Sequence, residues 1–251
     1  MAEALLIALA GMLAGAMNAI AGGGSFVSLP ALIAAGVPPV AANATSTVAL
    51  LPGTLASAWV YRRDLAPIGQ ASQKAMLAVT VLGGAAGAAL LLLMPSSSFE
   101  AALPWLLLGA TLALAAGPQL ARQLARRRMK AGPATLLLVQ FALGLYGGYF
   151  GGAVGIMMMA AWSLLVEADF RIFQPARTIL VSAANTLAAL VFACAGAVRW
   201  PEALTLAAGA FAGGYGGSVV ARHLPAPLLR MATLCLCATV TLLFFLKIVR
   251  A

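Results

Sequence analysis

Long apolar runs separated by short polar segments set the pattern of this 251-residue chain. A membrane-spanning helix needs about 20 apolar residues. Runs near that length cover residues 4–21, 40–61, 73–94, 103–121, 133–150, 175–198, 201–221 and 227–248. Two shorter runs, 25–36 and 153–166, follow the first and fifth long runs. No run alternates with the two-residue period of a strand, so the pattern predicts an all-α, polytopic membrane helix bundle.

Composition supports this class. Apolar residues make up 63% of the chain and charged residues 8%, whereas soluble domains have about 45–50% and 25%. The net charge of +9 comes from basic residues between apolar runs, so topology explains it better than a nucleic-acid partner does. The three cysteines, Cys194, Cys235 and Cys237, lie in apolar runs without histidine or acidic neighbours, and no metal site or cofactor is predicted.

Three consecutive glycines, Gly22, Gly23 and Gly24, interrupt the first apolar region. Each costs a helix interior roughly 1 kcal/mol relative to alanine, so the helix should break there. The next run has about a dozen residues and reaches roughly 17 Å, about half of a hydrocarbon core. Its free N–H groups, with Asn18 and Ser25 beside them, predict an anion-binding site. The alternative is that the glycines only allow helices to pack closely.

The two halves of the chain repeat each other. Gly53-Thr-Leu-Ala56 recurs as Asn185-Thr-Leu-Ala188, and the glycine-rich stretch from Gly15 to Ser25 resembles Gly144 to Gly155. The predicted organisation is a first transmembrane repeat over 1–121, a basic cytoplasmic connector over 122–132 and a second repeat over 133–251. Each half holds about four spans and one glycine-broken, re-entrant half-helix. Such duplication is common in transporters, whose substrate site lies where the repeats meet.

These motifs resemble the sulfite exporter TauE/SafE family, also called the toluene sulfonate uptake permease family. The resemblance rests on Asn18-Ala-Ile-Ala-Gly-Gly-Gly-Ser25, on Ala42-Asn-Ala-Thr-Ser-Thr-Val-Ala49 and, in the second half, on Gly147-Gly-Tyr-Phe-Gly151 and Ala184-Asn-Thr-Leu-Ala-Ala189. It implies transport of sulfur-containing anions such as sulfite, sulfoacetate and other sulfonates. Where the family usually has a second glycine cluster, this chain has Gly152-Ala-Val-Gly155.

Polar side chains inside the apolar runs agree with an anion path. In the run from residue 40, Asn43, Thr47 and Thr54 share one helical face, and Ser46 lies on the neighbouring stripe. In the second half, Thr178, Ser182 and Asn185 recur at i, i+4 and i+7. These groups can hydrogen-bond a sulfonate and still release it. The alternative is that they join helices or bond to their own i−4 carbonyls.

Arg177 is the most informative charge, because it lies at the start of the second polar stripe. Its planar guanidinium suits an oxyanion with several oxygens. It is equally compatible with an interfacial arginine that reaches the lipid headgroups or pairs with Glu167 or Asp169.

Two topologies remain open at this stage. If the short runs are re-entrant loops after full spans, eight spans place both termini in the cytoplasm; if they cross, ten spans give inverted halves. Both satisfy the positive-inside rule, and the length of the short runs favours re-entry.

The sequence therefore predicts a multi-pass secondary transporter of a small sulfur-containing anion in the bacterial inner membrane, and no enzyme. One histidine and six carboxylates are too few for a membrane-embedded active site, the least favoured alternative. A passive anion channel is the other alternative. The lipid bilayer and a small anionic substrate are the expected partners, with a coupling proton or sodium ion and a homo-oligomer left open.

Overall fold

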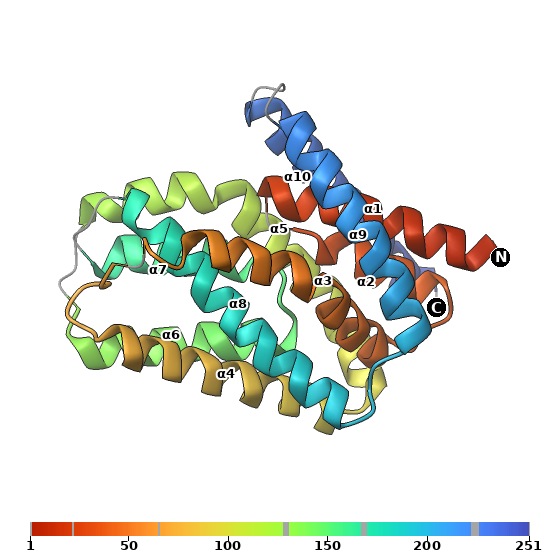
Figure 1. Cartoon of the computed structure of the whole chain (residues 1–251), viewed down its shortest axis with the longest axis horizontal. Helices are drawn as coiled ribbons and strands as arrows, with labels where there is room; N and C mark the ends of the chain where they lie inside the picture. Colours follow the sequence, from red (N-terminus) through yellow and green to blue (C-terminus); the bar gives the residue numbers. More distant parts are fainter. Residues whose placement is uncertain are drawn as a thin grey trace. The chain divides into compact units, whose positions relative to one another are not determined.

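A computed structural model describes residues 2–21, 23–64, 66–127, 131–166, 170–221 and 226–250. The described residues form helices without strands, in the order α1 (Ala2–Ala21), α2 (Ser25–Ala34), α3 (Pro39–Tyr61), α4 (Gln73–Leu93), α5 (Ser96–Arg127), α6 (Pro133–Tyr149), α7 (Val154–Leu165), α8 (Phe170–Cys194), α9 (Trp200–Ala221) and α10 (Ala226–Arg250) (Figure 1). The prediction of an all-helical membrane bundle is confirmed.

The short runs are half-length helices, as predicted. α2 has 10 residues and α7 has 12, whereas α3 and α8 have 23 and 25. By length and composition, three described helical segments could cross a membrane: Gln73–Leu93, Ser96–Gly117 and Phe173–Cys194. The bounds of α5 differ most from expectation, because it starts at Ser96 and continues to Arg127, beyond both ends of the predicted run 103–121. The first part of the predicted connector is therefore helical, since its Ala, Gln, Leu and Arg residues all favour a helix.

The chain forms two compact units that draw on both halves of the sequence. The first unit comprises Met1–Gly53, Leu91–Thr111 and Phe192–Ala251, and the second comprises Thr54–Leu90 and Leu112–Val191. The first unit therefore contains α1, α2 and most of α3 together with α9 and α10. The second contains α6, α7 and most of α8 together with α4. The first unit thus combines helices of the first half with α9 and α10, the second combines helices of the second half with α4, and α5 is divided between the two.

In the first unit, α1 packs closely against α9 (Figure 1). The contact is made by Gly-x-x-x-Gly pairs, a spacing that lets two backbones approach. A Cβ atom on Gly11 would overlap the carbonyl oxygen of Leu206, and one on Gly213 would overlap that of Met12. The contacts advance in the same direction along both helices, so α1 and α9 are parallel.

The second unit repeats this arrangement with α4 and α6. A Cβ atom on Gly144 would lie 2.7 Å from the carbonyl oxygen of Thr80, and one on Gly148 would overlap that of Gly84. These helices are also parallel. Figure 1 shows α4 and α6 side by side. Each unit is thus built on one parallel pair of long helices joined through glycines.

Each half-helix runs back along the long helices of its own unit. In the first unit, Gly24 lies beside Leu50, and Ser28 bonds to Ser46, so α2 is antiparallel to α3. In the second unit, the N–H of Ala131, just before α6, donates to the carbonyl of Leu165 at the end of α7 (3.3 Å). α7 therefore returns the chain to the level at which α6 starts.

A buried aromatic core fixes α7 and α8 in the second unit. The Trp162 ring is fully buried and meets the Phe173 ring edge-on at 5.7 Å between centroids. The surrounding cluster also includes Ile68, Met76, Leu136, Val154, Met158, Leu165, Ala176 and Leu180. Aromatic pairs of this geometry add to the energy of burial, so the core holds the start of α8 against the end of α7.

The half-helix directions generate a labelling prediction. Cysteines introduced at Ala4 and Pro38 should label from one face of the membrane, because the chain returns along α2 to the level at which α1 starts. Cysteines at Ala134 and Val166 should form a second same-face pair. The background lacks the native Cys194, Cys235 and Cys237. The eight-span topology instead requires opposite faces within each pair, so that outcome would contradict the helix directions.

The glycine contacts generate a second prediction. Gly148→Ala should lower the free energy of unfolding by roughly 1–3 kcal/mol, the usual cost of overpacking, since the new Cβ has no room against α4. Gly109→Ala is the matched control, because nothing lies within 4 Å of the added Cβ. Thermal unfolding in detergent measures both. Equal melting temperatures would show that α4 and α6 are not in close contact.

Candidate functional site

The first candidate site is the break between α1 and α2, in the first unit. Gly22 lies outside the described residues, whereas Gly23 and Gly24 are buried and Ser25 is half-buried. The N–H of Phe26 donates to the carbonyl of Gly23, and that of Ser28 to the carbonyl of Gly24, both at 3.1 Å. Among the residues that the structure describes, no side chain caps this N-terminus. The N–H groups of Phe26 and Ser28 are therefore already bonded within this turn, so a bound acceptor would be met by the N–H groups that precede Phe26.

Gly23 and Gly24 differ in their surroundings. A Cβ on Gly24 would lie 2.7 Å from the carbonyl oxygen of Ala14 and 3.3 Å from the Cβ of Asn18. The nearest atom to a Cβ on Gly23 is the Cε of Met17 at 3.6 Å, an ordinary contact. Gly24 therefore lets α2 start against α1, whereas a methyl group on Gly23 would be accommodated at ordinary contact distances. Asn18, which is half-buried, lies next to the break as the sequence suggests.

Ser46 of α3 is bonded to the half-helix. The hydroxyl of Ser46 lies 2.6 Å from the hydroxyl of Ser28. The Ser28 hydroxyl donates a hydrogen bond to the carbonyl oxygen of Gly24 (3.1 Å). Sequence reasoning missed Ser28, although its position four residues after Gly24 is the spacing at which a serine bonds to a helix carbonyl. These bonds connect α3 to the first turn of α2, so Ser46 supports the break directly.

Other polar groups of α3 have varied roles. The Thr47 hydroxyl donates to the carbonyl of Asn43 (2.9 Å), so its hydrogen is used within its own helix. Asn43 is buried. The buried Thr45 hydroxyl accepts the N–H of Arg199 at the start of α9 (3.0 Å). Thr54 falls in the second unit, so the predicted stripe of Asn43, Thr47 and Thr54 is divided between the two units.

The second candidate site is the break between α6 and α7. Gly151 has a φ of 80° and Ala153, the residue before α7, has a φ of 57°. The left-handed conformation favours glycine over alanine. The N–H groups of Ile156 and Met157 donate to the carbonyl of Ala153 at 2.9 and 3.1 Å. The chain therefore starts a half-helix here with fewer glycines than in the first break.

Arg177 lies against the first turn of α7. A Cβ on Gly155 would be 3.0 Å from Cδ, 3.2 Å from Cγ and 3.5 Å from Nε of Arg177. The glycine leaves room for this side chain, which is half-buried. Within the described part of the chain, no hydrogen bond or ion pair engages the guanidinium. Glu167 and Asp169, its alternative partners from the sequence, lie outside the described residues.

The polar stripe of α8 is heterogeneous. The Thr178 hydroxyl donates to the carbonyl of Gln174 (3.0 Å), which matches the alternative of bonding within the helix. Ser182 is 2% exposed, and its buried hydroxyl has no partner among the described residues. Asn185 is half-buried. An anion is bound by donors, so the unsatisfied Ser182 hydroxyl is a stronger candidate than Thr178.

A buried polar network anchors α7, and sequence reasoning missed it. Gln140 of α6 is fully buried and donates through Nε2 to the Thr80 hydroxyl (2.8 Å), while its Oε1 accepts the Trp162 indole N–H (3.1 Å). The network links α4, α6 and α7. A glutamine alone inside the apolar run 133–150 was the available signal, because polar residues in membrane helices usually face partners.

The described residues thus place one half-helix N-terminus in each unit, with Ser46 and Ser28 at the first and Arg177 at the second. Among these residues, no group of three His, Cys, Asp or Glu side chains comes together. Interrupted helices inside an apolar helical bundle are typical of membrane transporters.

The comparisons with known proteins name the family. The family described as "Sulfite exporter TauE/SafE" matches residues 7–244. "Probable membrane transporter protein YfcA" of Escherichia coli K12 is 30% identical over 207 residues, which cover 82% of this chain and 76% of that protein. "Probable membrane transporter protein ORF9" of Sinorhizobium sp is 30% identical over 211 residues, covering 83% and 79%. A "Probable membrane transporter protein" of Haemophilus influenzae is 27% identical over 203 residues, covering 81% and 79%. No solved structure gives a significant match.

The protein is a helical membrane transporter by its fold and its relatives. The chain belongs to the sulfite exporter TauE/SafE family, as its motifs suggested.

The difference between the two glycines gives a prediction. Gly24→Ala should lower the free energy of unfolding by roughly 1–3 kcal/mol, because the added methyl group must displace the Ala14 carbonyl. Gly23→Ala is the control, since its methyl group meets only ordinary contacts. Chromatography and thermal unfolding of both purified variants provide the measurement. If the two variants melt together, the α1–α2 junction is not packed as described.

Proposed function

We propose that the protein is a secondary transporter that moves a small sulfur-containing anion, such as sulfite, sulfoacetate or another organosulfonate, across the bacterial inner membrane. The observation that carries this proposal is the position of Arg177 across the first turn of α7. A guanidinium and a helix N-terminus both favour an anion, and here they lie together in one unit. The name of the family, a sulfite exporter, agrees with this preference.

The chemistry of the site suits a sulfonate or sulfite. These anions carry several oxygens, and an arginine can bond to two of them in parallel. Backbone N–H groups at the start of α7 would donate hydrogen bonds to another oxygen of the anion. The Ser182 hydroxyl is a donor in the same unit without a partner among the described residues. We assign the first break, with Asn18, Gly22 to Ser25, Asn43, Ser46 and Thr47, the corresponding role in the first unit.

The proposal includes no catalysis. The described carboxylates Glu3, Asp64, Glu100 and Glu202 lie at or near helix ends or in connections, so they do not form a convergent acid and base set inside the bundle. Transport against a gradient would require a coupling proton or sodium ion. A multi-pass arrangement is part of this proposal, and the three described segments long and apolar enough to cross a membrane support it.

A ligand screen and a flux assay test the function. Sulfite, sulfoacetate or another sulfonate should raise the melting temperature of the purified protein, because a ligand that binds only the native state stabilises it. Sulfate, taurine and carboxylates serve as comparison ligands. In proteoliposomes, the stabilising anion should accumulate against its gradient when an ion gradient is applied. Flux that only dissipates the gradient would indicate a channel instead.

Arg177 is the most direct mutational test. Arg177→Gln should weaken binding of the best anion by about tenfold or more, because a charge-assisted hydrogen bond is worth roughly 1.5–3 kcal/mol. Arg177→Lys should restore only part of the affinity, since lysine lacks the bidentate geometry. Arg199→Gln is the control, because Arg199 is an exposed arginine that pairs with Glu202 at 3.4 Å. Wild-type affinity in a folded Arg177→Gln protein would refute the assignment.

A further inference from the structure

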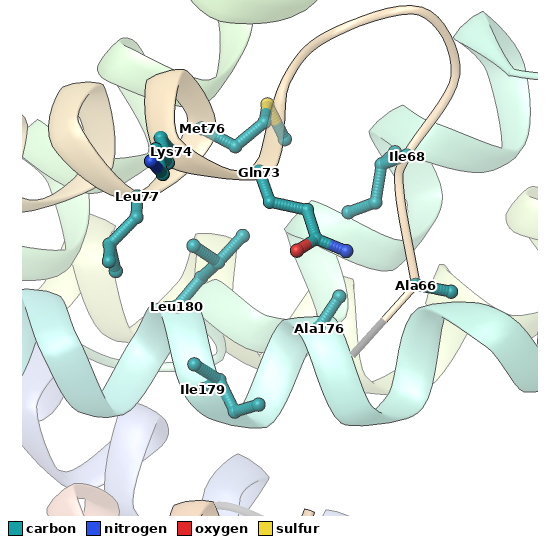
Figure 2. A pocket seen from close by; sticks show the side chains of 9 residues that line it. All are labelled: Ala66, Ile68, Gln73, Lys74, Met76, Leu77, Ala176, Ile179 and Leu180. Atoms are coloured by element: carbon teal, nitrogen blue, oxygen red, sulfur yellow. The ribbon is translucent and has the colours of Figure 1, made fainter. Parts of the chain in front are cut away.

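A cavity of about 170 Å³ lies in the second unit between the start of α4, the connection before it and α8. Figure 2 shows side chains from all three segments around it. Its walls are formed by Ala66, Ile68, Gln73, Lys74, Met76, Leu77, Ala176, Ile179 and Leu180. The cavity is separate from the candidate anion site, because its lining includes neither Arg177 nor the polar stripe of α8.

The lining combines an apolar wall with two polar side chains. Seven of the nine lining residues are apolar. Gln73 extends between Ile68 and Ala176 in Figure 2, and Lys74 is exposed. Such a wall cannot replace the hydration of a small inorganic anion, whose transfer into apolar surroundings is strongly unfavourable. It suits a ligand with an apolar body and one anionic group.

The position of the cavity at the start of α4 indicates that the ligand comes from the lipid bilayer. The membrane-spanning segment Gln73–Leu93 starts at the cavity, so Lys74 lies at the end of a span, where lipid headgroups are found. The Ser72 hydroxyl accepts the N–H of Ala75 (3.1 Å) and caps this helix start. The helix start also favours negative charge. An ammonium group at this level attracts anionic headgroups, while the apolar wall contacts acyl chains.

We propose that this cavity binds an anionic phospholipid, with the phosphate beside Lys74 and the upper part of an acyl chain against Met76, Ile179 and Leu180. The lipid would cover the apolar wall between α4 and α8. Because α8 also carries Arg177, the bound lipid would contact the same helix as the candidate anion site without contributing to it. The proposal is independent of which anion is transported.

Native mass spectrometry of the full chain in mild detergent tests this proposal, with phosphatidylglycerol, phosphatidylcholine and soluble glycerol 3-phosphate as probes. The wild type should retain phosphatidylglycerol in preference to phosphatidylcholine, and glycerol 3-phosphate should not compete. Lys74→Gln should weaken phosphatidylglycerol binding by about fivefold, the effect of one basic residue near a headgroup. Arg63→Gln, an exposed basic residue of the same connection outside the cavity lining, should have no such effect.

A second pair of variants tests the acyl site. Ile179→Trp should fill the cavity and reduce retention of both lipids, whereas Leu82→Trp, on an exposed part of α4, should not. If Ile179→Trp does not fold, Leu77→Trp replaces it, since Leu77 also lines the cavity. Unchanged lipid binding in both Lys74→Gln and the tryptophan variant would overturn the proposal. Equal competition by glycerol 3-phosphate would overturn it as well, because the cavity would then bind a free phosphate.

Discussion

A helix that starts inside an apolar bundle leaves its first N–H groups without intrahelical partners, and the rest of this structure depends on how those groups are accommodated. In lipid, such a break is tolerated only where protein surrounds it. Both breaks here meet this condition within their own units. α2 starts against the Ala14 carbonyl and the Ser28–Ser46 pair, and α7 starts beneath the side chain of Arg177.

The parallel glycine contacts provide the surrounding protein. α1 and α9 approach through Gly11 and Gly213, and α4 and α6 approach through Gly144 and Gly148. Two helices joined by a short loop run antiparallel, so each parallel pair needs a helix from the other half: α9 pairs with α1, and α4 pairs with α6. This exchange makes the fold interdependent. A half of the chain alone would lack the parallel partner of its first helix.

The sequence was sufficient to predict the order of the described helices and the half-length of α2 and α7, because apolar run length and three contiguous glycines indicate them directly. It did not predict the exchange of α4 and α9. Gly-x-x-x-Gly spacing occurs in four helices of this chain and does not specify which pairs associate. The distinct surroundings of Gly23 and Gly24 also depend on α1, and Ser28 becomes relevant only once α2 and α3 are antiparallel. All the substrate-binding assignments stay predictions: Asn18, Gly22, Gly23, Gly24, Ser25, Asn43, Ser46, Thr47, Thr54, Arg177, Thr178, Ser182 and Asn185.

The environment of Arg177 carries the argument about substrate one step further. A buried or half-buried guanidinium is costly unless a partner compensates its charge, and charged residues inside membrane helices usually face such a partner. The half-helix N-terminus beside it is no compensation, because both have the same sign. Among the residues that the structure describes, no acidic side chain pairs with Arg177, so a bound anion would supply a counter-charge to both positive elements beside Gly155. Such a site would favour small oxyanions over neutral solutes of similar size.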